Sequence, residues 1–250
     1  MKIKFLGTGS GKTSLNRYHS SLLISSSKYN LLVDCGDGIS KAILAQNIDF
    51  NLIDSVLISH FHSDHFSGLP SLITQMKLSS RKNGLKIFVH SSEKDFLEDF
   101  IFRSYIFRER INFEFSIVPF DEEKEIELFK DFNFTSKLNS HLDKYRKYNH
   151  EKKLGFVSLS FLFKDDENSC IYSGDVGNQN DLYLFNQKVD WFITETSHIK
   201  FESVLDLLEK LDPAKIILTH IGDDFYPSLP ENLKSCIISA YDGLELSHSG

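Results

Sequence analysis

Residues 60–65 place four metal-ligand side chains close together, in the pattern His-x-His-x-Asp-His. The apolar residues before them, 54–59, predict a buried strand, and the apolar segment 72–76 after them predicts a helix. His60 and His62 leave the same side of an extended backbone, whereas Asp64 and His65 lie past the bend and point to a second position. Because zinc prefers four ligands and a catalytic zinc keeps one place for water, we predict two metal ions that need further ligands.

The rest of the chain alternates between predicted strands and helices. Several of the strands are followed directly by His or Asp, and active sites of α/β proteins gather at such strand ends. No linker or low-complexity tract divides the sequence, so we predict a single domain over residues 1–250. Strands are predicted at 2–6, 22–25, 31–34, 85–90, 113–117, 126–129, 132–135, 155–163, 170–173, 189–194 and 216–218, and helices at 39–46, 96–101 and 204–211.

Three residues just past the later strands supply the missing metal ligands: His141, Asp175 and His220. A carboxylate bridges two cations more readily than a neutral imidazole, so Asp175 is predicted to be shared. We assign His60, His62 and His141 to one metal, and Asp64, His65 and His220 to the other. His19 is a candidate for a residue that contacts a metal ligand without binding the metal itself.

The glycine-rich segment 7–13 resembles a phosphate-binding P-loop but lacks one of its required residues. Leu6 stands where the first glycine of that pattern belongs, and no helix-forming run follows. We therefore interpret the segment as a turn that lets the backbone approach the metal site.

Charge and composition narrow the function classes. The net charge of −7 argues against broad non-specific binding of nucleic acids, although a local basic patch remains compatible with it. The three cysteines form no CxxC pair, so neither a zinc ribbon nor a disulfide framework is expected. No apolar run approaches the length of a membrane span, and no signal peptide is recognised at the N-terminus. We expect a cytoplasmic protein without a membrane partner.

These motifs together resemble the metallo-β-lactamase superfamily over nearly the whole chain. The opening residues 5–10, the segment 33–38, the ligand motif 60–65 and the strand ends at His141, Asp175 and His220 carry the resemblance. The opening loop and residues 240–243 resemble the phosphodiesterase branch, which includes ribonuclease Z and the cyclic phosphodiesterase of the carbon–phosphorus lyase pathway. The resemblance implies a four-layer αββα sandwich with two divalent metal ions, zinc or manganese, along one edge. It also suggests a homodimer.

Within that branch, the resemblance gives catalytic roles to residues outside the metal ligands. Ribonuclease Z places a catalytic histidine at the spacing that separates His198 from His220, which implies that His198 is a general acid with Glu195 orienting it. Asp64 is expected to receive the proton of the attacking water. The long arm with which ribonuclease Z grips tRNA does not fit between His141 and Asp175. The basic loop 144–153 fits there, either contacting a substrate phosphate or base or forming a solvated hairpin tip.

The leading hypothesis is therefore a dinuclear metal-dependent phosphodiesterase that acts on a small or cyclic nucleotide-like substrate. One alternative is a ribonuclease Z-like endonuclease that processes tRNA 3′ ends without the long arm, with RNA as its partner. A second is a lactonase or thioesterase, although this chain lacks the Thr-x-Gly-His pattern usual before the third ligand in those enzymes. The third is a metal-binding protein without catalytic activity.

Overall fold

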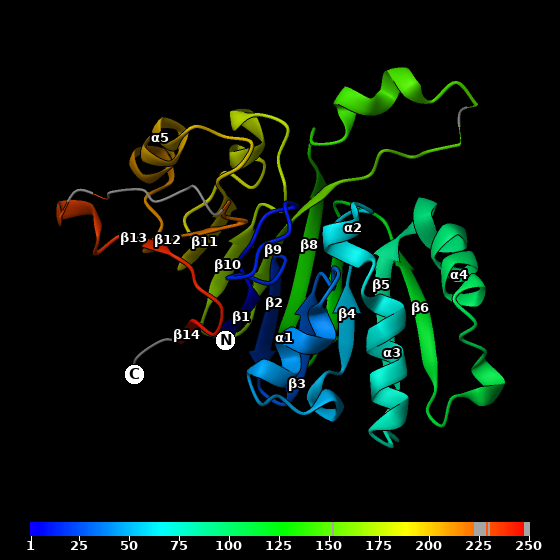
Figure 1. Ribbon diagram of the computed structural model, residues 1–250. Coiled ribbons are helices and arrows are strands. Elements are labelled where there is room, and N and C mark those ends of the chain that lie inside the picture. The colour runs from blue at the N-terminus through cyan, green and yellow to red at the C-terminus, as the bar shows by residue number, and fades with distance from the viewer. Residues whose placement is uncertain (152, 223–228, 230, 248–250) are drawn as a thin grey trace.

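Two mixed β-sheets lie face to face, and helices cover their outer faces (Figure 1). The structure is a computed structural model that describes residues 1–151, 153–222, 229 and 231–247. The first sheet contains, in spatial order, β14 (Glu245–Ser247), β1 (Lys2–Gly7), β2 (Ser21–Ser26), β3 (Tyr29–Val33), β4 (Ser55–Leu57), β5 (Leu85–His90) and β6 (Phe115–Phe120). The second contains β13 (Ile237–Ser239), β12 (Lys215–Thr219), β11 (Trp191–Glu195), β10 (Ser169–Tyr172), β9 (Leu159–Lys164), β8 (Phe132–Leu138) and β7 (Glu125–Phe129).

The helices pack on the two outer faces. On the first sheet lie α1 (Ile39–Ala45), α3 (Leu69–Leu78) and α4 (Lys94–Arg103), whereas α5 (Phe201–Leu211) covers the second. The one-turn helix α2 (Ser63–Phe66) lies at the sheet edge. The short 3₁₀ helices are η1 (Phe50–Leu52), η2 (Ser91–Glu93), η3 (Arg108–Arg110), η4 (Asp143–Tyr148), η5 (Gln179–Tyr183) and η6 (Glu231–Leu233).

Both faces of the central strands are buried, and alternate side chains enter different cores. In β2, Leu22 and Ile24 point into the core between the sheets, while Leu23 points to the core under the helices. In β12, Ile217 enters the core between the sheets, while Ile216 packs under α5. A strand covered on both faces needs apolar residues at successive positions, which is why these segments lack a polar alternation. The expected αββα sandwich is confirmed.

Parallel strands bring distant chain segments to one edge of the sandwich. Strands β3 to β6 run parallel in the first sheet, and β10 to β13 run parallel in the second. Strand β8 is antiparallel to β9, which is antiparallel to β10, so β8 ends at the same side as β10. The residues that follow these strands therefore meet at a common edge.

The predicted strands and helices agree with the structure except at a few places. The predicted strand 155–163 begins only at Leu159, because Phe156 has a φ of 55° and interrupts the extended backbone. The strand predicted from 113 begins at Phe115. Strands β13 and β14, of three residues each, were not predicted. Among the described residues no helix has the length and apolar content needed to cross a membrane.

We expect the buried Arg81 to stabilise the turn before β5. Its guanidinium donates to the carbonyls of Asn83 (2.7 Å), Phe50 (3.1 Å) and Gly84 (2.7 Å), and only 1% of the residue is exposed. Arg81→Met leaves these carbonyls without a donor and should lower the free energy of unfolding by roughly 2–4 kcal/mol, measured by urea denaturation. The neighbouring exposed residue provides the control: Lys82→Met should change stability by less than about 0.5 kcal/mol. Equal effects of the two variants would contradict this role.

Candidate metal centre

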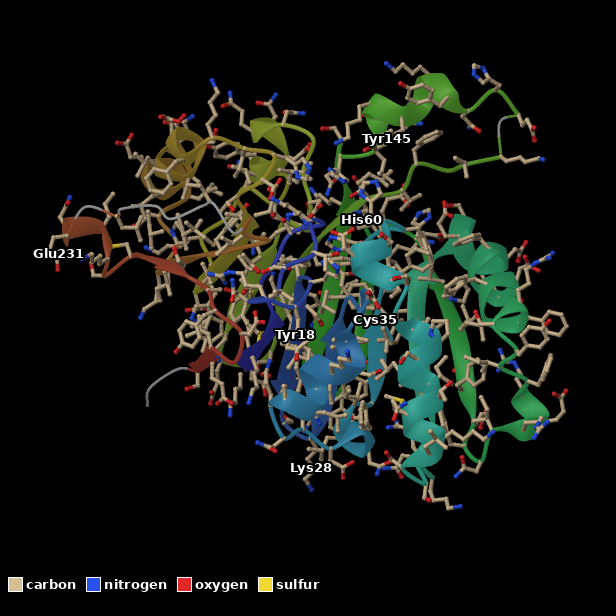
Figure 2. The ribbon with its side chains drawn as sticks, in the orientation of Figure 1. Tyr18, Lys28, Cys35, His60, Tyr145 and Glu231 are labelled. Carbon is tan, nitrogen blue, oxygen red and sulfur yellow. The ribbon has the colours of Figure 1, made fainter. Side chains whose placement is uncertain are left out.

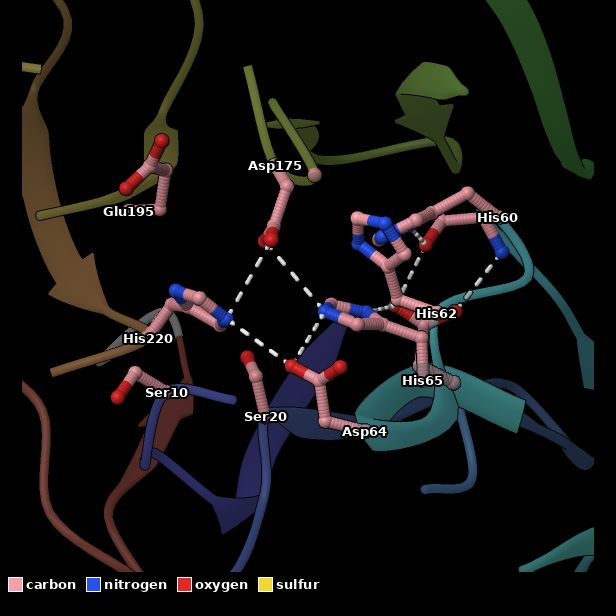
Figure 3. Close-up of polar contacts among 12 residues, drawn as sticks. Ser10, Ser20, His60, His62, Asp64, His65, Asp175, Glu195 and His220 are labelled. Carbon is pink, nitrogen blue, oxygen red and sulfur yellow. Dashed lines mark hydrogen bonds and ion pairs between the residues drawn. The ribbon is translucent and has the colours of Figure 1, made fainter. Parts of the chain in front are cut away.

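All seven predicted ligands meet at the edge where the strands end. Figure 3 labels six of them: His60, His62, Asp64, His65, Asp175 and His220. They form two groups whose candidate ligand atoms lie within 4.8 Å of one another, and Asp175 belongs to both groups. The first group is His60, His62, His141 and Asp175, and the second is Asp64, His65, Asp175 and His220. These are the two sets assigned from the sequence, with the same shared carboxylate. That ions bind there stays a prediction.

The distances within each group suit the coordination of a single cation. In the first, Nε2 of His141 lies 3.1 Å from Nδ1 of His62 and 3.7 Å from Oδ2 of Asp175. In the second, Oδ2 of Asp64 lies 3.4 Å from Nε2 of His65 and 3.3 Å from Nε2 of His220. Ligands about 2.0–2.1 Å from a tetrahedral zinc ion are separated from one another by about 3.3 Å. The side chains are therefore spaced like the ligands of a metal ion.

Three buried polar atoms of this cluster have no hydrogen-bond partner among the described residues. They are Nε2 of His60, Nε2 of His65 and Oδ1 of Asp175. Burying such atoms without a partner is costly, and native proteins rarely do it. All three atoms belong to residues of the two ligand sets, so a pair of divalent cations would satisfy them. The donor set of imidazoles and carboxylates fits zinc, and also the harder manganese ion.

The other ring nitrogen of four ligand histidines is held by an oxygen. Nδ1 of His65 donates to Asp34 (2.7 Å), and Nδ1 of His60 donates to the Ser59 hydroxyl (3.0 Å). Nδ1 of His220 contacts the Ser197 hydroxyl (3.2 Å), and Nδ1 of His141 contacts the Val176 carbonyl (3.4 Å). When Nδ1 of a neutral ring donates its proton to such an oxygen, Nε2 keeps its lone pair for a metal.

Asp34 is an important residue that sequence reasoning did not include in the site. It is fully buried, with a left-handed φ of 61°, and its carboxylate also accepts from the backbone and hydroxyl of Ser59 (both 2.8 Å) and from the Tyr172 hydroxyl (3.3 Å). The sequence feature that could have pointed to Asp34 is its position at the end of the predicted strand 31–34. Asp37 follows the same strand but is exposed, and the sequence does not distinguish the two.

The glycine-rich loop lies against the second ligand set, as interpreted from the sequence. A Cβ atom added to Gly11 would lie 3.0 Å from Oδ2 of Asp64. The loop is paired with the residue after His220, because Ile221 donates to the Thr8 carbonyl (2.7 Å). His19 contacts the carbonyl of Ser10 through Nδ1 (2.8 Å), so it supports this loop and not a ligand directly.

His198 lies beside the ligand cluster and is fixed by Glu195. Its Nδ1 is 2.9 Å from Oε1 of Glu195, and its ring centroid lies 4.8 Å from that of His141. The buried Glu195 also accepts hydrogen bonds from the backbone of Val176, Ser197 and His198, so its oxygens are occupied in orienting this turn. The side chain of His198 is 29% exposed. That His198 acts as a general acid stays a prediction.

Burial and neighbouring charges give the histidines different proton affinities. Burial lowers the pKa of His60 well below its usual value and that of His141 to about 4, so both rings are neutral at pH 7 and able to bind a metal. Burial also opposes the charged form of His65, but the carboxylates of Asp175 and Asp34 raise its pKa well above the usual value. A cation in the second set would compete with that proton. The hydrogen bond to Glu195 raises the pKa of His198.

The predicted basic loop 144–153 does not form a plain hairpin tip. Its first part is the 3₁₀ helix η4, which projects beyond the sheet edge between β8 and β9 (Figure 1). Tyr145 of this helix lies near the ligand cluster, with its ring centroid 5.7 Å from that of His62. Lys152 lies outside the described residues.

We predict that Asp34→Asn weakens metal binding by about 10- to 100-fold, because an amide cannot accept all of the hydrogen bonds that the carboxylate accepts. Metal affinity should be measured by competition with a chromogenic chelator. Asp37→Asn is the matched control, since Asp37 lies three residues away and is exposed. Unchanged affinity in Asp34→Asn, with the fold intact by circular dichroism, would show that Asp34 does not support the site.

Comparisons with known proteins agree with this geometry. Ribonuclease Z from Methanosarcina acetivorans is 35% identical over 100 residues, which cover 40% of this chain and 33% of that enzyme. The chain thus matches only about a third of that relative's length. The structure of the metallo-beta-lactamase fold protein YhfI from Bacillus subtilis has a TM-score of 0.78 at 18% identity, covering 98% of both chains. A diphosphatase of the PhnP family has a TM-score of 0.67 at 17% identity, covering 99% of this chain and 98% of that one.

The structural matches identify the metallo-β-lactamase fold, and the predicted resemblance to ribonuclease Z and its phosphodiesterase relatives is confirmed. The cluster of histidines and aspartates is intact and is consistent with a dinuclear metal site in this fold. A family model described as the anti-Pycsar protein Apyc1 matches residues 1–237, and the chain belongs to that family.

Proposed function

We propose that this protein is a dinuclear metal-dependent phosphodiesterase that hydrolyses cyclic nucleotides. The observation that carries the proposal is the pair of ligand sets sharing Asp175, with His198 beside them. Membership of the Apyc1 family, which degrades cyclic nucleotides, supports the substrate class. The seven ligands His60, His62, Asp64, His65, His141, Asp175 and His220 would hold two zinc or manganese ions.

When bound, two such cations supply Lewis acidity that activates a water and polarises the phosphoryl oxygens. The residues of the chain then carry the proton transfers. In this proposal Asp64 takes the proton that the attacking water loses as its oxygen bonds to phosphorus. His198 donates a proton from Nε2 to the ribose oxygen as its bond to phosphorus breaks, while Glu195 holds Nδ1. The product is a nucleoside monophosphate.

A tRNA 3′-processing endonuclease is the second candidate, because the curated relatives are ribonuclease Z enzymes. The described part of the segment between β8 and β9 contains only η4 and short connections, which offers no long arm for tRNA. The net charge of −7 also disfavours a polyanionic partner. Cleavage of a precursor tRNA, without hydrolysis of cyclic nucleotides, would favour the endonuclease.

We expect metal-loaded protein to hydrolyse at least one of the four common 3′,5′-cyclic mononucleotides. His62→Ala should abolish this activity, because it removes a ligand of the first set. The nucleoside monophosphate product is measured by chromatography, and His90→Ala is the control, since His90 belongs to neither ligand set and pairs with Glu122. Wild-type activity no higher than that of His62→Ala would refute the phosphodiesterase.

The proposed role of His198 predicts a dependence on the leaving group. Protonation of an alkoxide by a general acid contributes about 10²–10⁴-fold in rate, whereas nitrophenolate leaves readily without a proton. His198→Ala should therefore slow cyclic nucleotide hydrolysis by about that factor and bis(p-nitrophenyl) phosphate hydrolysis far less, with metal content unchanged.

His220→Ala is the comparison variant for this experiment. It removes a ligand and should reduce both activities together with metal content. If His198→Ala slowed both substrates equally or lost metal, His198 would not be the general acid.

A further inference from the structure

A small pocket adjoins the metal centre on the side of His62. It has a volume of about 220 Å³ and lies between the turn after β4, the end of η2 and the segment that joins β8 to β9. Its walls are mainly apolar and aromatic and include Phe61, Tyr145, Leu154 and Phe156, with Glu93 as the one carboxylate. His62 belongs both to this wall and to the first ligand set. Figure 2 places Tyr145 above His60, on the projecting segment.

The aromatic walls are held in place from behind. The ring of Phe61 packs edge-on against Phe66 and Phe96, with centroid distances of 4.8 and 5.0 Å. Tyr145 stands nearly perpendicular to His62, at 84°, and is 38% exposed. An apolar wall that remains open to solvent beside a catalytic centre is typical of a ligand site.

The backbone opposite Tyr145 is fixed in an unfavourable conformation. Phe156 has a φ of 55°, which is rare for a bulky residue, and such strain clusters at binding sites. Next to it, Gly155 passes so close to η2 that an added Cβ would lie 2.6 Å from Oε1 of Glu93. The side-chain oxygen of Asn149 accepts hydrogen bonds from the backbone N–H groups of Lys153 (2.9 Å) and Leu154 (3.3 Å). These bonds tie the residues before Gly155 to the end of η4.

We propose that this pocket binds the nucleobase of the cyclic nucleotide, an inference that rests on the proposed function. Its volume is below the roughly 300–1,000 Å³ of pockets that enclose drug-sized ligands, so it suits one flat ring system and not a whole nucleotide. The His62 side chain belongs both to the pocket wall and to the first ligand set, so a base in the pocket would lie next to a phosphate at the cluster. Tyr145 provides a stacking surface, and the Glu93 carboxylate accepts from an N–H group of the base.

The test compares KM for the four cyclic nucleotides with KM for a base-free substrate, methyl riboside 3′,5′-cyclic phosphate. From the usual contribution of base stacking, Tyr145→Ala should raise KM for the nucleotides about 5- to 150-fold, with kcat little changed. KM for the base-free substrate should stay the same, which a merely structural defect would not allow. Tyr145→Phe keeps the ring and should behave like wild type.

Tyr148→Ala is the matched control, because Tyr148 lies in the same helix, is 65% exposed and does not line the pocket. Equal loss on both substrates in Tyr145→Ala, or an equal effect of Tyr148→Ala, would overturn the pocket assignment. If wild-type protein hydrolysed none of the four nucleotides, the proposed function would fail and calorimetric binding of the same nucleotides would decide about the pocket. Weaker binding by Tyr145→Ala than by wild type would then uphold the pocket, while equal or absent binding would refute it.

Discussion

The carboxylate of Asp34 joins the parts of the molecule that must be aligned before a metal centre can form. It stands at the end of β3, accepts two hydrogen bonds from Ser59 at the end of β4, and accepts the proton of His65 from the ligand turn. Its contact with the Tyr172 hydroxyl reaches across the core to β10 in the second sheet. A buried, fully bonded carboxylate of this kind fixes geometry, because losing any one partner leaves charge without compensation.

The ligand cluster places several titratable groups in a water-poor environment. Seven buried or half-buried side chains form two adjoining groups, and three of their polar atoms have no hydrogen-bond partner among the described residues. Without cations this arrangement is destabilising, whereas ligands that bind only the folded state stabilise it. We therefore view the fold and its ions as thermodynamically linked: the sandwich holds the ligands in position, and the ions would offset the cost of burying them.

The proposed function gives substrate selection and catalysis to different parts of the chain. The ligands lie on strand ends and on α2, which the two sheets hold rigidly. The proposed base pocket is closed instead by the connection between β8 and β9. The sequence of a loop on a rigid scaffold can vary without disturbing the core. A change in the connection between β8 and β9 would therefore alter the substrate preference, while the metal cluster and its reaction stay the same.

The sequence by itself determined the ligand set and most of the strands. Histidines and aspartates at strand ends, and apolar runs with defined periods, are local patterns that can be recognised in the sequence alone. Only the tertiary structure decided between Asp34 and Asp37, since both follow the same strand and only the pairing of β3 with β4 turns one of them inward. It also decided that residues 155–158 are not a strand. Their apolar pattern satisfies a strand, but the contact with Glu93 and the left-handed φ of Phe156 belong to a pocket wall, and no local sequence pattern encodes a contact between segments so far apart.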